Sequence, residues 1–420
     1  MKSRDYPLMS KKIPLVPKLR FPEFAEEGEW VEKSLGSVGK FVGGGTPSTS
    51  ESKYWDGNIQ WYTPTEVKDG NLKPSLRTIT KEGLKDSSAK LLPKGTILVT
   101  TRATIGNVAI ATQECTTNQG FQSLIVQKSE DNKFWYYWIE LHRNEFIRRS
   151  SGSTFKEIGK TEIKIIPSLS PAKAEQQKIA SCLSSLDQLI VAQKQKLTAL
   201  KDHKKGLMQN LFPKEGQKVP HYRFPKFEKE GEWVEDNLEN RGIFTGGGTP
   251  SKNKNDYWKG NFPWVSSSDI LEESIHHLNP TRYITKEAIK KSATKIIPAN
   301  SLLIVSRVGA GKVAVSREEV CTSQDFCSFT PKKDDAIFLG YYLRFNKNAL
   351  LRFSQGMAIK GFTRREIAIL NLSFPKNILE QQKIASCLSA LDQVITAQSE
   401  KVEQLEQHKK GLMQSLFPKP

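Results

Sequence analysis

Two long segments of the chain place apolar residues at alternating steps of four and three positions. The first repeat runs from Ile179 to Leu211, and the second runs from Ile384 to Leu416. This spacing is typical of the apolar seam along which paired helices pack in a coiled coil. It predicts two long helices, over residues 171–213 and 377–418. The predicted seam residues are Ile179, Leu183, Leu186, Ile190, Leu197 and Leu200 in the first helix, and Ile384, Leu388, Leu391, Ile395, Val402 and Leu405 in the second.

Both seams are interrupted by polar residues at the same two places. Gln193 and Lys204 interrupt the first seam, and Gln398 and Lys409 interrupt the second. Polar seam residues cost stability and often fix the register or orientation of paired helices. Because a long segment separates the two helices, the second can return antiparallel to the first, which is the arrangement we expect. The alternative is that each helix packs only on its own domain.

Residues at the ends of these segments predict where the helices start and stop. Ser170 followed by Pro171 fits an N-cap with proline at the first helical position. Asn377 with Glu380 three residues later fits the start of the second helix. Pro213 and Pro418 follow the two segments and predict their ends.

The chain is duplicated well beyond the helices. The segments 175–213 and 380–418, which both begin EQQKIASCLS, are identical at 28 of 39 positions. GGGTPS occurs at 43–48 and again at 246–251, and GEWVE occurs at 28–32 and 231–235. Each copy is long enough to be a domain plus a helix, so the duplication predicts a pseudo-two-fold molecule. The predicted parts are an N-terminal extension (1–20), a first globular domain (21–170), a first helix (171–213), a linker (214–223), a second globular domain (224–376) and a second helix (377–418).

Short apolar runs bounded by glycine, proline and asparagine predict strands within each domain. The runs are 96–100, 108–111, 123–126 and 163–166 in the first domain, and 302–306 and 313–316 in the second. Helical stretches are expected at 134–149 and 336–353. The sequence therefore predicts an α+β fold, with two mixed globular domains separated by two long antiparallel helices. The paired tryptophans Trp30/Trp233, Trp55/Trp258 and Trp61/Trp264 are expected in the cores, with Tyr54 and Tyr257 partly exposed.

The net charge indicates the class of partner, and the cysteine content indicates the cellular compartment. The chain has 63 Lys and Arg against 45 Asp and Glu, a net charge of +18, which favours a polyanion such as nucleic acid. No apolar run is long enough to span a membrane. Five cysteines without CxxC spacing indicate a reducing compartment and no structural zinc, so we expect a cytoplasmic protein without a membrane partner.

Several catalytic interpretations fail on the residues themselves. Gly309-Ala310-Gly311-Lys312 lacks the spacing of a phosphate-binding loop, and neither GGG triplet continues into one. A nuclease grouping of Asp56, Glu66 and Lys68 is not preserved in the second domain. The chain also lacks the Asn-Pro-Pro-aromatic tetrapeptide of amino-methyltransferases. We expect no catalytic residues, no metal site and no cofactor in this chain.

The duplication suggests how to choose candidate DNA-binding residues. Residues shared by both domains are expected to contact phosphates, whereas residues that differ within matching loops could read different bases. The three consecutive glycines of each GGG triplet allow the bare backbone to approach DNA phosphate or another chain closely, or to form a tight turn in the core. The candidates are Gly44, Thr46, Lys53, Tyr54, Thr65, Lys68, Arg77, Lys81, Arg102, Thr104, Gln119 and Lys156 in the first domain, and Gly247, Thr249, Lys252, Tyr257, Ser268, Asp269, Arg282, Lys286, Arg307, Lys312, Gln324 and Lys360 in the second.

The repeated order GGGTPS, YW-x-G-N-x-x-W and EQQKIA resembles the specificity subunit of type I restriction–modification systems over residues 21–418. The resemblance implies that each recognition domain reads one half of a split, asymmetric DNA site. It also implies that the helices set the gap and dock two modification (methyltransferase) subunits. S-adenosylmethionine would then bind to the modification subunits, which methylate adenine at N6. ATP and Mg would act on restriction subunits of the full complex.

Two other classes of function stay open at this point. A coiled-coil adaptor without a DNA role would not need the net positive charge. A fragment of a fused restriction–methylation enzyme would need the missing tetrapeptide. The sequence favours a non-catalytic DNA-specificity subunit that binds double-stranded DNA.

Overall fold

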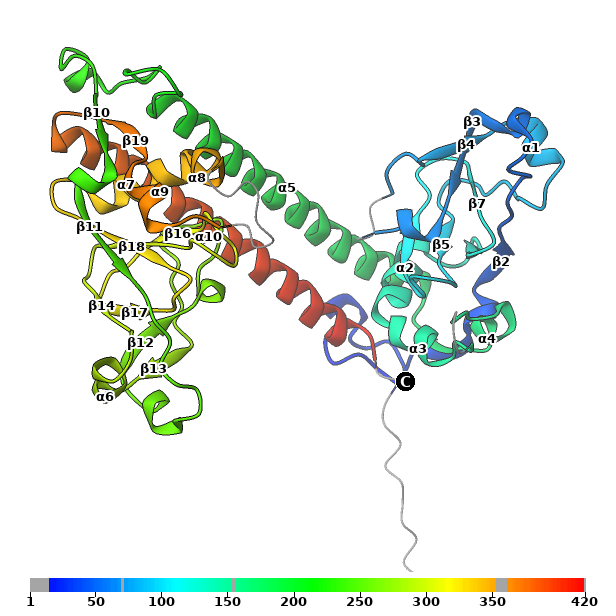
Figure 1. The fold of residues 1–420 in the computed structure, drawn as a ribbon. Helices are drawn as coiled ribbons and strands as arrows, with labels where there is room; N and C mark the ends of the chain where they lie inside the picture. The colour runs from blue at the N-terminus through cyan, green and yellow to red at the C-terminus, as the bar shows by residue number, and fades with distance from the viewer. Residues whose placement is uncertain (1–14, 69–71, 153–155, 353–360, 419–420) are drawn as a thin grey trace, which may run out of the picture. The chain divides into compact units, whose positions relative to one another are not determined.

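The computed structural model describes residues 15–68, 72–152, 156–352 and 361–418, and it divides into two compact units (Figure 1). Unit 1 comprises residues 1–193 and 401–420, and unit 2 comprises residues 194–400. The two long helices, α5 (Lys173–Leu211) and α10 (Ile378–Leu416), each continue from one unit into the other. Each unit therefore consists of a globular domain, the start of its own long helix and the end of the other.

Unit 1 combines antiparallel sheets with short helices. A four-stranded sheet has the order β2-β8-β5-β6, a three-stranded sheet has the order β4-β3-β7, and β1 pairs with β9. Within the second sheet, β3 and β7 run parallel. The strands are β1 (Val31–Ser34), β2 (Gly39–Gly43), β3 (Trp55–Tyr62), β4 (Arg77–Ile79), β5 (Ile97–Val99), β6 (Val108–Ile110), β7 (Cys115–Thr117), β8 (Gln122–Val126) and β9 (Pro167–Ser170); the short helices are α1 (Lys81–Lys85), α2 (Asn132–Leu141), α3 (Arg143–Arg148) and α4 (Lys160–Lys164).

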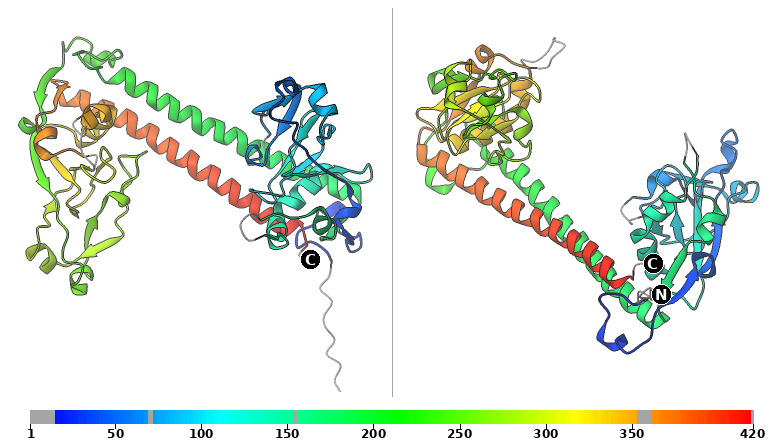
Figure 2. Two further views of the ribbon diagram at one scale, coloured as in Figure 1. Left: turned by 45° about the vertical axis from the view of Figure 1, so that its right-hand side comes forward. Right: turned by 90° about the horizontal axis from the view of Figure 1, so that it is seen from below.

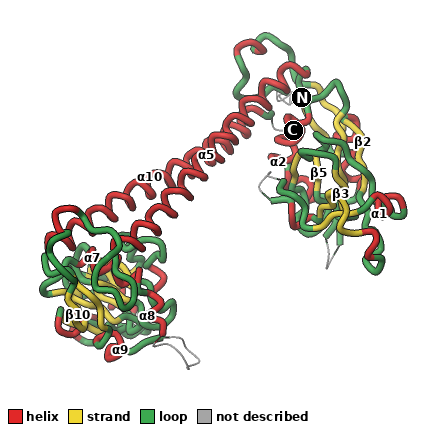
Figure 3. Tube along the Cα trace, turned by 90° about the horizontal axis from the view of Figure 1, so that it is seen from above, coloured by secondary structure: helices red, strands yellow, loops and turns green. Residues whose placement is uncertain are grey.

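Unit 2 repeats this arrangement with one additional short strand, β14, at the edge of its second sheet. Its sheets have the orders β11-β18-β15-β16 and β13-β12-β17-β14, and β10 pairs with β19. The strands are β10 (Val234–Asn237), β11 (Gly242–Gly246), β12 (Phe262–Val265), β13 (Arg282–Ile284), β14 (Ile296–Ile297), β15 (Leu302–Ile304), β16 (Val313–Val315), β17 (Val320–Thr322), β18 (Cys327–Pro331) and β19 (Asn371–Phe374); the short helices are α6 (Lys286–Lys290), α7 (Ala336–Phe345), α8 (Lys347–Arg352) and α9 (Arg364–Ala368). Figure 3 shows strands within both globular parts, and the predicted α+β class is confirmed.

Within each unit the end of one long helix lies beside the start of the other (Figure 2). In unit 2, Leu211 and Phe212 belong to the same core as Ile384 and Leu388. In unit 1, Leu416 and Phe417 join Ile179 and Leu183 in the same way. The late residues of one helix thus meet the early residues of the other, which is antiparallel packing. All twelve predicted seam residues are buried or half-buried, as the four–three pattern requires.

The segments before each domain are hydrogen-bonded to the ends of the long helices. The predicted N-terminal extension lies largely outside the described residues, but Leu19 N donates to Ser415 O at 2.9 Å. In the predicted linker, Tyr222 N donates to Asn210 O at 2.9 Å. Both segments therefore join the globular domain to the end of the other long helix, because they carry equivalent backbone contacts.

Four local predictions are corrected. Residues 163–166 do not form a strand, because Ile163 lies in helix α4 and Ile166 N closes a turn onto Ile163 O at 3.2 Å. Ser170 does not cap α5, because it pairs with Val31 in a strand and the helix begins at Lys173. The helical stretch 134–149 breaks at His142, and the stretch 336–353 breaks at Asn346; both residues have non-helical backbone angles.

Candidate nucleic-acid interface

The GGGTPS turn of unit 1 is held to neighbouring loops by paired hydrogen bonds. Gly45 N donates to Thr117 O at 2.8 Å, and Trp61 Nε1 donates to Gly45 O at 2.9 Å. The hydroxyl of Thr46 donates to Gln119 Oε1 at 2.6 Å. Two predicted site residues from distant parts of the sequence, Thr46 and Gln119, are therefore brought together at the ends of β2 and β7.

The equivalent turn of unit 2 has the same contacts. Gly248 N donates to Thr322 O at 2.8 Å, and Trp264 Nε1 donates to Gly248 O at 2.9 Å. The Thr249 hydroxyl donates to Gln324 Oε1. The scaffold beneath the two candidate interfaces is thus conserved between the repeats.

The central glycine of each turn serves this scaffold. A Cβ atom on Gly44 would lie 2.0 Å from Asn118 O, and one on Gly247 would lie 2.0 Å from Ser323 O. Such distances leave no room for a side chain, so glycine is required for contact with the chain's own backbone. The prediction that Gly44 and Gly247 contact DNA is not needed to explain them.

A second loop of unit 1 meets the first through side chain–backbone bonds. Thr63 and Glu66 form a capping box around the short 3-10 helix Pro64–Glu66. Thr104 Oγ1 then donates to Pro64 O at 3.1 Å. This leaves Thr65 and Lys68 exposed on the capped loop. Exposed hydroxyl and ammonium groups of this kind can donate to base edges and phosphates.

The matching loop of unit 2 keeps the cap and changes the exposed residues. Ser266 and Asp269 form the capping box, and Asp269 is only 6% exposed, with Thr281 Oγ1 also donating to it at 3.1 Å. Lys312 Nζ lies 3.3 Å from two backbone carbonyls of the same loop. We therefore correct the prediction for Asp269, whose buried carboxylate holds this loop in shape. Lys312 also binds the loop backbone, and its role in DNA binding stays a prediction. Ser268 stays exposed at its tip.

An arginine lies over a tryptophan in both units. The Arg77 guanidinium lies 3.4 Å from the centre of the Trp55 ring, and that of Arg282 lies 4.5 Å from the Trp264 ring. Stacking of this kind fixes the plane of the guanidinium while leaving its edge able to donate hydrogen bonds. Arg77 is exposed, whereas Arg282 is half-buried and also donates to Ser266.

The aromatic prediction holds for one tyrosine and is wrong for the other. Tyr54 is half-buried, beside the exposed ion pair of Lys53 with Glu82 at 2.7 Å. Tyr257 is only 6% exposed because it packs with Trp264 and Ile284, so it is a core residue.

Most remaining candidates are exposed on loops or short helices. Arg102 forms an exposed ion pair with Glu157 at 2.9 Å, which a phosphate could displace. Lys360 lies outside the described residues. The other exposed candidates are Lys81, Lys156, Lys252, Lys286 and Arg307. Their role in DNA binding stays a prediction.

A buried arginine–glutamate pair, which the sequence did not lead us to predict, joins each globular domain to its long helix. Arg20 binds Glu175 through two hydrogen bonds, at 2.9 and 2.8 Å, and Arg223 binds Glu380 in the same way, at 2.8 and 2.7 Å. Glu175 and Glu380 are the first residues of the EQQ triplets. The signal was present in the sequence, because Arg-Phe-Pro-x-Phe occurs at 20–24 and again at 223–227.

The second residue of each EQQ triplet, a glutamine, makes a further hydrogen bond to the globular domain. Gln176 Oε1 accepts from Asp131 N at 2.9 Å, and Gln381 Oε1 accepts from Asp335 N at 2.9 Å. Asp131 and Asp335 in turn cap helices α2 and α7. The EQQ triplet thus positions each globular domain on its long helix.

The polar seam lysines also have partners. Lys409 pairs with Asp187 at 2.8 Å in unit 1, and Lys204 pairs with Asp392 at 2.5 Å in unit 2. Each aspartate also accepts a hydrogen bond of 2.6 Å from a buried tyrosine, Tyr137 or Tyr341. Burial and this bond raise the pKa of both phenols, so they stay protonated. The ion pairs join the two long helices at equivalent places in the two units, as expected of polar seam positions that set register.

Within the described residues, no helix is both long enough and apolar enough to cross a membrane, and no group of three or more His, Cys, Asp or Glu side chains is arranged to hold a metal ion.

A family model described as the type I restriction modification DNA specificity domain matches this chain twice, over residues 27–202 and 231–407. One similar protein is the type I restriction enzyme MjaIX specificity subunit of Methanocaldococcus jannaschii. It is 37% identical over 189 residues, and the match covers 44% of each chain. The chain therefore spans less than half the length of this relative. The MjaVIII specificity subunit of the same organism is 23% identical over 427 residues, covering 95% of this chain and 93% of that protein.

A solved structure with a similar fold is the type I restriction–modification S subunit from M. genitalium. The TM-score is 0.62 at 16% identity, over 96% of this chain and 100% of that one. A second, from a study of complex assembly in the type I R-M system, gives a TM-score of 0.58 at 17% identity, covering 92% and 97% of the two chains. At these identities the likeness establishes the fold.

Proposed function

Because the chain belongs to the type I restriction–modification DNA specificity family, we propose that it selects the DNA sequence on which a type I restriction–modification complex acts. The resemblance found in the sequence is confirmed by the two family matches. The role is recognition, without a reaction carried out by this chain. In this proposal the globular domain of each unit reads one half of a split, asymmetric site in double-stranded DNA.

The observation that carries this proposal is a shared scaffold with different exposed side chains. The Thr46–Gln119 and Thr249–Gln324 contacts are equivalent, so both units hold their loops in the same way. On the neighbouring capped loops, however, Thr65 and Lys68 of unit 1 are replaced by Ser268 and Leu271 of unit 2. Equivalent scaffolds that present different donors and apolar groups are suited to reading different base sequences.

We further propose that two modification subunits dock on the paired long helices. These subunits would bind S-adenosylmethionine and methylate adenine at N6 in each half-site. Restriction subunits of the full complex would use ATP and Mg. The net charge of +18 supports DNA as the common partner, since each neutralised phosphate releases counterions. The expected location is the cytoplasm.

A methylome tests the proposal directly. Cells co-expressing this chain with a matching modification subunit should acquire one new split motif with N6-methyladenine in both halves. Replacing residues 21–170 with the equivalent domain of another specificity subunit should change one half of the motif and leave the other half and the gap unchanged. Absence of new methylation from a soluble, assembled complex would favour the adaptor alternative.

A further inference from the structure

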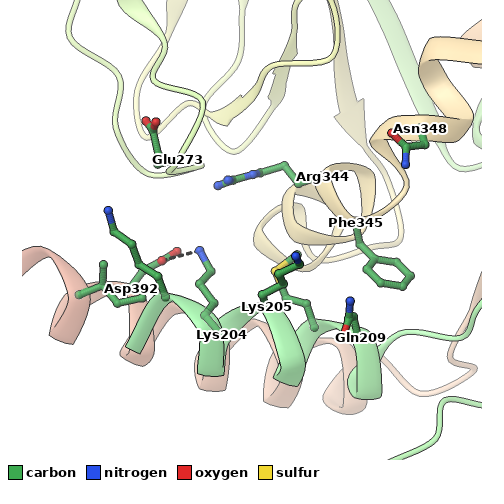
Figure 4. A pocket seen from close by; sticks show the side chains of 11 residues that line it. Lys204, Lys205, Gln209, Glu273, Arg344, Phe345, Asn348 and Asp392 are labelled. Atoms are coloured by element: carbon green, nitrogen blue, oxygen red, sulfur yellow. Dashed lines mark hydrogen bonds and ion pairs between the residues drawn. The ribbon is translucent and has the colours of Figure 1, made fainter. Parts of the chain in front are cut away.

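Unit 2 contains a half-open cavity of about 520 Å³ beside the long helices. Its walls come from the last third of α5, the middle of α10, helices α7 and α8 and the loop that carries Glu273, and Figure 4 shows the side chains that line it. Charged groups are concentrated there. The charged lining residues are Lys201, Lys204, Lys205, Glu273, Arg344 and Asp392.

The charges in this cavity do not balance. Lys204 and Asp392 neutralise each other through their ion pair, the only contact drawn between the residues of Figure 4. Three cations then remain, on Lys201, Lys205 and Arg344, against the single carboxylate of Glu273. Glu273 is exposed, and among the described residues it forms no ion pair with Arg344, although its charge acts on the guanidinium. The cavity therefore carries an excess of positive charge.

Arg344 is the most buried of the three unpaired cations. It extends from α7 over the Lys204–Asp392 pair (Figure 4), and its Nη1 is buried without a hydrogen-bond partner in the described residues. Burial lowers the pKa of the Arg344 guanidinium, even though Asp392 acts in the opposite direction. A buried donor without an acceptor costs about 1–3 kcal/mol, and more when charged. An oxyanion in the cavity would remove this cost.

In unit 1, the equivalent positions carry charges that balance more closely. In the matching alignment of α2 with α7, Glu140 of unit 1 takes the place of Arg344. Glu140 lies 3.3 Å from the seam lysine Lys409, so the carboxylate has a partner. On the long helices, Glu406 takes the place of Lys201. Two equivalent positions on different helices have therefore changed from acidic to basic in unit 2.

We propose that the unit 2 cavity is a binding site for a phosphate-class oxyanion. The Arg344 guanidinium supplies N–H donors in a fixed geometry, and Lys201 and Lys205 supply further positive charge at the rim. Met208, Phe345 and Ile395 form an apolar wall, which leaves room for an organic phosphate as well as for the free ion. The site is separate from the loops proposed to read DNA, and the inference does not depend on the proposed function.

Calorimetric titration of the full chain with inorganic phosphate and with pyrophosphate tests the site. Ionic strength is held constant with chloride. The wild-type chain should bind saturably, and Arg344→Glu should weaken binding at least about tenfold, since it removes the guanidinium and adds a like charge. Arg344→Glu copies Glu140 of unit 1, so it is expected to fold. Lys205→Glu should also weaken binding, whereas the matched control Lys410→Glu in unit 1 should not.

A competition experiment between pyrophosphate and a short DNA duplex identifies the source of the phosphate. If a short DNA duplex displaces bound pyrophosphate, the ligand is the DNA backbone; if it does not, the ligand is a free or organic phosphate. Absence of saturable binding, or equal binding by wild type and Arg344→Glu, overturns the proposal. Loss of modification-subunit assembly in Arg344→Glu without any phosphate binding would also overturn it, and would assign the cavity to a carboxylate of a partner protein.

Discussion

The Arg223 guanidinium holds the Glu380 carboxylate at two points, with Nε 2.8 Å from Oε1 and Nη2 2.7 Å from Oε2. Both side chains are almost fully buried. Because Arg223 precedes the globular domain and Glu380 begins a long helix, this pair joins two parts of unit 2 that are 157 residues apart. The pair recurs in unit 1 as Arg20 with Glu175, at a separation of 155 residues.

Replacement of Arg223 by methionine should strongly destabilise unit 2. Within the part of the chain that the structure describes, it leaves the buried Glu380 carboxylate with one side-chain hydrogen bond, from Trp233 Nε1 at 3.3 Å. Removing one partner of a buried pair typically costs about 3–5 kcal/mol. Urea denaturation followed by tryptophan fluorescence measures the change in the free energy of unfolding. The double variant Arg223→Met/Glu380→Met should recover much of the loss, and equal destabilisation of the single and double variants would contradict this account.

Replacing glycine by alanine should destabilise the protein in the GGGTPS turns and stabilise it in the long helices. Gly44→Ala and Gly247→Ala place a Cβ atom 2.0 Å from a backbone oxygen, so each should lower the melting temperature of its unit. Gly206 and Gly411 lie within α5 and α10 with open space around them, so alanine there should stabilise by about 0.5–1 kcal/mol. The melting temperatures of the four variants measure these effects. An unchanged melting temperature in Gly44→Ala would refute the close-packing explanation.

Much of the fold followed from the sequence because the duplication and the four–three spacing are strong, long signals. The predicted seam positions are buried or half-buried, since helical spacing fixes which face a residue occupies. Local signals were weaker where tertiary contacts decide the outcome. Ser170 has the chemistry of an N-cap, yet strand pairing with Val31 places it in a sheet. Ile163 lies in an apolar run that fits a strand as well as it fits the short helix observed.

The candidate interface was only partly predictable for a similar reason. Pairs such as Thr46 and Gln119 could be selected because both recur in the two copies. Asp269 was selected because it differs from Glu66, but both residues perform the same capping role. The pattern of Thr or Ser followed three residues later by Glu or Asp indicates that role. A conservative change within a capping box is therefore weak evidence for base recognition.

Acid should destabilise unit 1 partly through His142. Burial lowers the pKa of this imidazole from its usual 6.5, although the Trp138 carbonyl, 2.8 Å from Nδ1, and Glu145 act in the opposite direction. The folded state therefore favours the neutral ring. Its contribution to stability is complete above about pH 6.5 and is lost as the pH falls toward the lowered folded-state pKa.

His142→Asn should reduce this acid sensitivity. Asn346 occupies the equivalent place in unit 2 and donates to Tyr342 O at 3.0 Å, so asparagine can keep the backbone contact. The measurement is the free energy of unfolding between pH 7.5 and pH 5, at intervals of about half a unit. His276 in unit 2, whose pKa burial also lowers, should leave a residual slope in the variant. An unchanged slope in His142→Asn would show that this histidine is not linked to folding.

Replacement of Arg77 by alanine should weaken DNA binding by the assembled complex. Arg77 is exposed and is held over the Trp55 ring at 3.4 Å, so its position is fixed before DNA binds. If it contacts a phosphate, the slope of log affinity against log salt should fall by about 0.9. Lys128 is exposed beyond the opposite end of strand β8 from Gln119, and Lys128→Ala is the matched control. A slope equal to that of wild type would remove Arg77 from the interface.

The gap between the two half-sites should follow the length of the paired helices. Both helices pass from one unit to the other between Gln193 and Lys194 and between Glu400 and Lys401. Inserting seven residues at both places keeps the four–three seam and adds about 10 Å of helix. At about 3.4 Å per base pair, the recognised gap should lengthen by about three base pairs.

Methylome sequencing measures the gap, with the two half-sites as internal controls. Both half-sites should keep their sequences, because neither globular domain is altered. Insertion of four residues into α5 alone, between Gln193 and Lys194, should instead disturb the pairing, since the Lys204–Asp392 and Asp187–Lys409 pairs could no longer share one register. An unchanged gap in a folded, active seven-residue variant would show that the helices do not set the spacing, and that the separation is fixed by contacts outside them.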